Sequence, residues 1–248
     1  MHGDEGVARK RRPHRSRRVI LIALASVLTL SLIGGGVTLY VLGADNPALF
    51  EGKVSEVESR FADGYPQGEI ILTGSSFFER WSSSDEDLAP LDTINVGIGS
   101  TKIGDQAAYV DRLVTPFHPR AVVVYAGSND ISGLPFFSKQ GDDVAARVIS
   151  YLDDLHQTLP EARLYYVAIT EAPIRVGVRA QIQLANGLLA EYAKSTDFLT
   201  FIDTSPELLT PEEEIDATLF GSDNLHFNTL GYEKFSQAIR PILIEDLR

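Results

Sequence analysis

The chain has 248 residues, no cysteine and a formal net charge of −12 at pH 7. The absence of cysteine excludes disulfides, thiolate metal sites and cysteine nucleophiles. The length allows one ordinary catalytic domain with a short additional segment.

The first 42 residues differ in character from the rest of the chain. Residues 1–18 carry seven basic and two acidic side chains, and residues 19–42 carry no charge. An apolar stretch of this length can cross a hydrocarbon core of about 30 Å. Because basic flanks remain in the cytoplasm, we predict a cytoplasmic tail over residues 1–18, a transmembrane helix over residues 19–42 and a domain outside the membrane. A cleaved signal peptide is the alternative.

The chain after residue 18 is acidic, with 15 basic and 32 acidic side chains and a net charge of −17. This charge argues against nucleic acid as a partner and against electrostatic attachment to anionic lipid. Residues 43–67 are predicted to be a connector. Within it, apolar side chains at helical spacing indicate a short amphipathic helix over residues 49–61, either a stalk or the first packed helix of the domain.

From residue 68 to residue 248, short apolar segments alternate with longer amphipathic ones. The short segments predict strands at residues 69–73, 93–96, 121–126, 163–169 and 199–203. The longer segments predict helices at residues 104–114, 142–158, 178–195 and 229–247. This alternation is typical of a three-layer α/β/α domain with a central parallel sheet of about five strands. Such sheets bind ligands at the carboxyl ends of their strands.

The first predicted strand ends in a Gly-Ser-Ser turn, residues 74–76. A serine at the start of a helix can act as a nucleophile, because backbone N–H groups there stabilise developing negative charge. A serine that only caps a helix is the alternative. The aromatic residues that follow, Phe77, Phe78 and Trp81, are expected in the core rather than in an acyl or sugar site.

The second and third predicted strands also end in polar, glycine-containing segments. Residues 95–101 hold glycines that allow close backbone approach, so a main-chain N–H there can donate to an oxyanion. In the Gly-Ser-Asn-Asp segment, residues 127–130, the amide of Asn129 can donate in the same way. An ordinary turn is the alternative for this segment.

Charged residues follow in the last third of the chain. Arg175 and Arg179 are expected on a solvated helix face, with contact to an anionic substrate as the alternative. Asp223 precedes His226 by three residues, so its carboxylate can accept the proton of one ring nitrogen and leave the other facing a serine. An exposed loop or part of a metal site is the alternative; we expect no metal and no cofactor.

Together these segments resemble the four sequence blocks of the SGNH (GDSL-type) serine hydrolases, in order and at suitable intervals, over residues 69–247. The resemblance implies a flavodoxin-like SGNH hydrolase fold. It also implies that Ser76 is the nucleophile, that His226 is the base and that Asp223 orients the base.

The resemblance further implies an oxyanion hole made by the backbone N–H groups of Ser76 and Ser100 and the side chain of Asn129. The chain departs from the family pattern at two places. Ser75 stands where aspartate is frequent, and Ser100 stands where a glycine would align. Gly99 is the alternative donor.

These features favour a membrane-anchored, extracytoplasmic serine esterase whose substrate is a small-molecule or glycan ester. O-acetyl groups on cell-envelope glycan are the leading hypothesis. A lipid-ester or thioester hydrolase, an O-acetyltransferase with the same acyl-serine and a catalytically silent binding domain are the alternatives.

Overall fold

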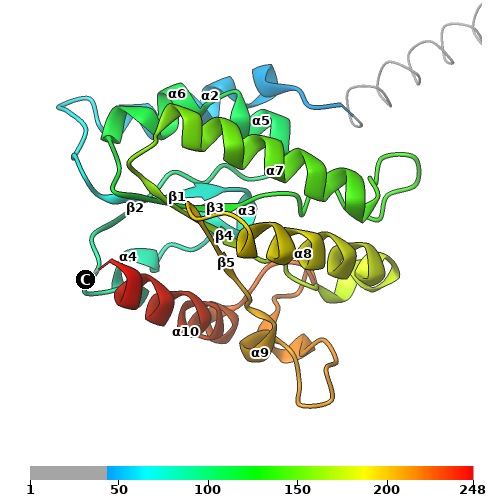
Figure 1. Cartoon of the computed structure of the whole chain (residues 1–248). Coiled ribbons are helices and arrows are strands. Elements are labelled where there is room, and N and C mark those ends of the chain that lie inside the picture. Colours follow the sequence, from blue (N-terminus) through cyan, green and yellow to red (C-terminus); the bar gives the residue numbers. More distant parts are fainter. Residues whose placement is uncertain (1–43, 248) are drawn as a thin grey trace, which may run out of the picture. The chain divides into compact units, whose positions relative to one another are not determined.

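The core of the domain is a sheet of five parallel strands in the order β2-β1-β3-β4-β5 (Figure 1). The computed structural model describes residues 44–247. The strands are β1 (Ile70–Gly74), β2 (Thr93–Asn95), β3 (Ala121–Tyr125), β4 (Arg163–Val167) and β5 (Leu199–Ile202). Ile71 of β1 pairs with Ile94 on one side and with Val122 on the other. The predicted parallel sheet of about five strands is therefore confirmed.

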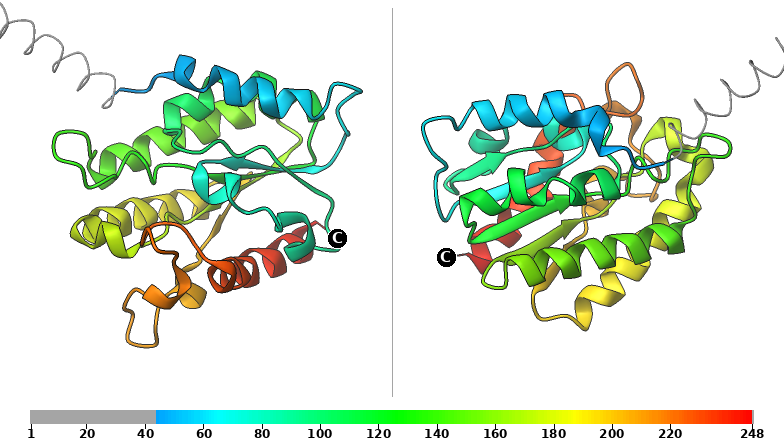
Figure 2. Two further views of the ribbon diagram at one scale, coloured as in Figure 1. Left: turned by 180° about the vertical axis from the view of Figure 1, so that it is seen from behind. Right: turned by 90° about the horizontal axis from the view of Figure 1, so that it is seen from above.

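Helices cover both faces of this sheet, as Figures 1 and 2 show. Alternate side chains of a strand point to opposite faces, so Ile71 joins one apolar cluster while Ile70 and Leu72 join the other. One cluster includes residues of α2 (Glu51–Ser59), α5 (Ile103–Ala107), α6 (Val110–Leu113), α7 (Gly141–Thr158) and α8 (Arg179–Lys194). The other face packs against α3 (Ser76–Glu79), α4 (Ser84–Asp87), α9 (Ser205–Leu208) and α10 (Thr229–Asp246).

The short 3₁₀ helices are η1 (Pro47–Phe50), η2 (Thr115–Phe117), η3 (Pro173–Val178) and η4 (Ala217–Leu219). The expected helix over residues 49–61 appears as η1 followed by α2. Val54 of α2 is fully buried in the core, so this helix packs on the domain rather than forming a free stalk.

The predicted continuous helix over residues 104–114 is wrong, because the chain breaks between α5 and α6. Arg112 of α6 forms ion pairs with Glu51 and Glu58 of α2. These contacts are made between segments far apart in the sequence, and such contacts override local helix propensity.

The predicted tail and transmembrane helix, residues 1–42, lie outside the described residues. Among the residues that are described, no helix has the length and apolarity needed to cross a bilayer.

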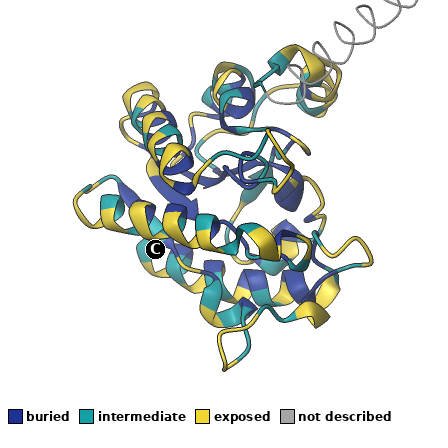
Figure 3. Ribbon diagram, turned by 90° about the vertical axis from the view of Figure 1, so that its right-hand side faces the viewer, coloured by how far each residue is buried: buried dark blue, intermediate teal, exposed yellow. Residues whose placement is uncertain are grey.

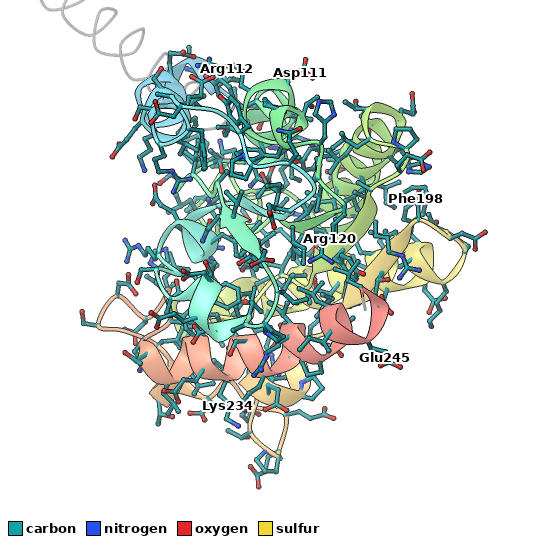
Figure 4. All side chains as sticks on the ribbon, turned by 90° about the vertical axis from the view of Figure 1, so that its left-hand side faces the viewer. Asp111, Arg112, Arg120, Phe198, Lys234 and Glu245 are labelled. Atoms are coloured by element: carbon teal, nitrogen blue, oxygen red, sulfur yellow. The ribbon has the colours of Figure 1, made fainter. Side chains whose placement is uncertain are left out.

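The two ends of the sheet differ. Figure 3 views the domain from the carboxyl side of the strands, and Figure 4 views the opposite side, where Arg120 and Phe198 precede β3 and β5. At that amino side, Arg120 and Arg163 donate hydrogen bonds to the backbone carbonyls of Leu247 and Asp246 at the end of α10. The residues predicted to carry chemistry lie at the carboxyl side.

Candidate active site

The turn after β1 places Ser76 at the first position of α3. Gly74 is needed there, because a Cβ on this residue would lie 2.8 Å from the carbonyl oxygen of Tyr125. Glycine therefore allows the end of β1 to lie close to Tyr125 of β3, directly before the chain enters the short helix. Ser76 is 9% exposed, so its hydroxyl is mostly shielded yet reachable from the carboxyl side of the sheet.

The structure brings His226 to Ser76 across 150 residues of sequence. The Nε2 atom of His226 lies 2.7 Å from the Oγ atom of Ser76, and its Nδ1 atom lies 2.7 Å from Oδ2 of Asp223. Asn224, between the acid and the base, has φ +53°, the left-handed conformation that asparagine tolerates. The three predicted residues thus form one continuous hydrogen-bonded chain.

The side chain of Asp223 is 43% exposed, and its contacts favour the ionised carboxylate. Partial burial raises its pKa. Hydrogen bonds from the His226 ring and from the backbone N–H groups of His226 and Leu225 outweigh that effect and hold the pKa well below its usual range. Arg80 lies 3.3 Å from the same carboxylate. These contacts favour the ionised form of Asp223, which can stabilise a protonated histidine.

The segment after β2 places Ser100 in the left-handed region, with φ +72°. The neighbouring Gly99 is packed against Glu79, and a Cβ at Gly99 would lie 2.1 Å from Oε2 of Glu79. Gly99 is thus packed against Glu79, and the roles of Ser100 and Gly99 as oxyanion donors stay predictions.

Asn129 is held in a defined orientation after β3. Its amide nitrogen donates to the carbonyl oxygen of Thr101 at 3.0 Å, and its amide oxygen accepts from Arg175 at 3.1 Å. A guanidinium can only donate and a carbonyl can only accept, so both partners require the same orientation of the amide. One N–H of the amide remains for a ligand.

Two residues next to the predicted site residues are also buried, Asp130 and Ser75. Asp130 is fully buried and accepts the backbone N–H of Ile103 at the start of α5, with Lys139 and Arg147 beside its other oxygen. Asp130 therefore links the Gly-Ser-Asn-Asp segment, residues 127–130, to α5. The Oγ atom of Ser75 is also buried, but it has no hydrogen-bond partner among the described residues.

Arg175 is the residue that the sequence interpretation placed wrongly. It was expected on a solvated helix face, but it lies in η3, is 7% exposed and donates to the carbonyl oxygen of Ser128 as well as to Asn129. Arg179 is partly exposed and pairs with Glu171. The spacing of charged residues does not indicate which of the two arginines is buried, because burial depends on the path that the chain takes after β4.

The aromatic residues after the nucleophile belong to the core, as predicted. Phe77, Phe78 and Trp81 are each at most 1% exposed and join the apolar cluster under α10. The ring of Phe77 lies 5.5 Å from that of His226, centroid to centroid, so the base packs against a core residue.

Several cavities lie elsewhere on the domain. One of about 490 Å³ lies beside α8 and α9, and one of about 550 Å³ lies beside α2 and β2. Neither is lined by Ser76, His226 or Asn129. Within residues 44–247, no group of three His, Asp or Glu side chains is placed to hold a metal ion.

Comparison with solved structures places this geometry in a known fold. A GDSL-like lipase from Bacteroides thetaiotaomicron has a TM-score of 0.61 at 16% identity, covering 81% of this chain and 98% of that one. A family 3 carbohydrate esterase from Clostridium thermocellum has a TM-score of 0.57 at 17% identity, covering 73% and 98%. An acetyl-xylooligosaccharide esterase from Geobacillus has a TM-score of 0.57 at 14% identity, covering 71% and 93%.

The sequence itself gives the family. No protein with a curated description matches the chain. The family model of the GDSL-like lipases and acylhydrolases matches residues 61–234, which include all four blocks. The chain therefore belongs to the GDSL-like lipase/acylhydrolase family and is a carboxylic ester hydrolase with the SGNH hydrolase fold.

Proposed function

We propose that this hydrolase removes O-acetyl groups from carbohydrate through an acyl-enzyme at Ser76. The carrying observation is the hydrogen-bonded chain from Ser76 through His226 to Asp223, with both links at 2.7 Å. That arrangement supplies a nucleophile, a base and an orienting carboxylate in contact.

In the first half of the reaction, Ser76 Oγ attacks the carbonyl carbon of the acetyl ester while its proton passes to His226 Nε2. The carbonyl oxygen becomes an oxyanion that faces the backbone N–H groups of Ser76 and Ser100 and the free amide N–H of Asn129. When the tetrahedral intermediate collapses, the C–O bond to the sugar breaks, and the sugar oxygen takes the proton from His226.

In the second half, water attacks the acetyl group on Ser76 and gives its proton to His226. The same donors receive the oxyanion again. Collapse breaks the bond to Ser76 Oγ, which recovers the proton from His226, and acetate leaves. Asp223 remains ionised throughout and stabilises the histidine in its protonated form.

One observation supports a short acyl group on a sugar: two of the similar structures are a carbohydrate esterase and an acetyl-xylooligosaccharide esterase.

We also propose that the hydrolase acts outside the cytoplasm, tethered by residues 19–42. The support is the uncharged stretch of 24 residues behind a basic segment. Protease added to intact spheroplasts should then digest the domain while a cytoplasmic marker survives. Digestion only after lysis would refute this location, and a mature N-terminus near Asp45 would show cleavage instead of an anchor.

The activity is tested with the purified full chain and three substrates: an aryl acetate, the matching aryl octanoate, and an O-acetylated xylo-oligosaccharide. We expect turnover of both acetates, little turnover of the octanoate, and none with Ser76→Ala. Faster turnover of the octanoate would refute the acetyl preference. Acetyl transfer to an added sugar acceptor, in place of acetate release, would make the protein a transferase.

A further inference from the structure

The guanidinium of Arg175 is a buried positive charge beside the proposed oxyanion hole. The residue is 7% exposed and donates to two oxygens, the carbonyl of Ser128 and the side chain of Asn129. Both acceptors are neutral. Within the described part of the chain, no ion pair joins Arg175 to a carboxylate, whereas Arg179, four residues on, pairs with Glu171 and Glu214.

Such an unpaired buried charge is costly in a folded protein, because desolvation is not repaid by an opposite charge. Burial lowers the pKa of Arg175. Arginine nevertheless stays protonated at any pH where proteins fold. The site therefore holds a fixed positive charge that lacks a counter-ion until negative charge develops nearby.

The position of this charge relative to the amide is defined by the structure. Arg175 contacts the oxygen of the Asn129 amide, so the N–H groups of that amide point away from the guanidinium. One of them is taken by Thr101. A cation at the oxygen end of an amide withdraws electron density and makes its N–H a stronger donor, and hydrogen bonds in such a chain strengthen one another.

We propose that Arg175 is a positioning residue for ester hydrolysis: it fixes the Asn129 amide and provides, through that amide, the positive potential that stabilises the oxyanion. The proposal rests on the proposed role of Asn129. It explains why a cation without a counter-ion is retained in the fold, since its electrostatic partner is the charge of the tetrahedral intermediate.

The test is a double-mutant cycle on aryl acetate hydrolysis by the full chain. Arg175→Met should lower kcat by about 10- to 100-fold, the effect typical of groups that orient a functional side chain, with little change in KM. Asn129→Ala should also lower kcat. If Arg175 acts through Asn129, adding Arg175→Met to Asn129→Ala should cost almost nothing further.

Two more variants separate this role from a structural one. Arg179→Met, the same change at the arginine that pairs with Glu171, should leave kcat within about two-fold, as expected for a site without contact to the reacting groups. Arg175→Lys keeps a positive charge but cannot donate from a rigid fork to both oxygens, so its kcat should fall between wild type and Arg175→Met. Thermal unfolding of each variant reports whether it is folded. If Arg175→Met does not fold, Arg175→Lys takes its place in the double-mutant cycle.

Each result decides the proposal. Loss of the Arg175 effect in the Asn129→Ala background supports it. Independent, multiplicative losses overturn it, as does an effect confined to KM or a kcat loss matched by Arg179→Met. If Asn129→Ala has wild-type kcat, the proposed oxyanion hole fails first and the inference falls with it.

Discussion

The two halves of the active site are built in different ways. In the proton-transfer half, Asp223 accepts hydrogen bonds from Leu225 and His226, all within three residues of sequence. In the oxyanion half, Asn129 is held by Thr101 and Arg175, which are 28 and 46 residues away. The Asp223–His226 pair depends on a local turn, whereas its contact with Ser76 and the orientation of Asn129 depend on how separate segments meet.

The halves also differ in how their charges are accommodated. The Asp223 carboxylate is partly exposed, and its pKa is depressed because hydrogen bonds to the charged form outweigh partial burial. The Arg175 guanidinium is buried and has only neutral acceptors. Solvent partly screens the charge of Asp223, whereas only protein groups stabilise the charge of Arg175.

The largest expected effect breaks the proton-transfer half. Ser76→Ala and His226→Ala should each lower kcat by about 10⁶-fold, because nucleophile and base act as one unit. Both should abolish labelling by a fluorophosphonate probe, whereas Ser75→Ala should still be labelled. Labelling that persists in Ser76→Ala, located on another residue by mass spectrometry, would contradict the assignment.

The next effect tests the orienting carboxylate alone. Asp223→Asn keeps a side-chain oxygen for the turn but cannot stabilise a protonated histidine, so kcat should fall by about 10⁴-fold. A stopped assay with aryl acetate measures the loss. In a Ser76→Ala background the same change should have almost no further effect. Near wild-type activity for Asp223→Asn would mean that His226 acts without it.

A smaller effect is expected in the oxyanion half. Asn129→Ala removes one donor, which typically costs about 10²–10³ in kcat, or roughly 2.7–4 kcal/mol of transition-state stabilisation. KM should change little, because the donor acts mainly on the developing charge. Steady-state kinetics and thermal unfolding should be measured together. A loss of stability without a loss of kcat would identify Asn129 as a turn residue only.

The smallest effect is the pH dependence of the free energy of unfolding. Its sign is opposite for Asp130 and Asp223, because their pKa values are shifted in opposite directions. Burial raises the pKa of Asp130 above its usual value, although Lys139 and Arg147 oppose the shift. A group with a raised pKa stabilises the fold below its unfolded value, near 3.9, and that contribution is lost as pH rises through the folded pKa. For Asp223, whose pKa is depressed, the contribution is present above about pH 3.9 and is lost as pH falls through the folded pKa.

Urea unfolding of wild type, Asp130→Asn and Asp223→Asn over a range of pH measures these contributions. The stability difference between wild type and Asp130→Asn should shift against wild type as pH rises above about 4. The difference between wild type and Asp223→Asn should shift against wild type as pH falls below about 4. Slopes of the same sign for both variants would show that the two carboxylates do not differ in environment.

The sequence by itself determined the parts that depend on local pattern. Alternating apolar segments predicted the five strands, and the serine, asparagine and histidine blocks predicted which residues meet at the carboxyl side of the sheet. The aspartate three residues before His226 was also readable, because a turn of that length brings its carboxylate back to the ring. Periodicity and spacing involve residues close together in the chain, so they can be recognised from the sequence alone.

Tertiary structure alone decided the rest. The helix expected over residues 104–114 is broken where α6 packs on α2, and the order of the strands in the sheet came only from their pairing. Above all, Arg175 and Arg179 look alike in the sequence, yet one lies buried against Asn129 and the other is partly exposed and pairs with Glu171. Burial and partner identity depend on segments far apart in the chain, and no local pattern records which of two similar charges the fold will enclose.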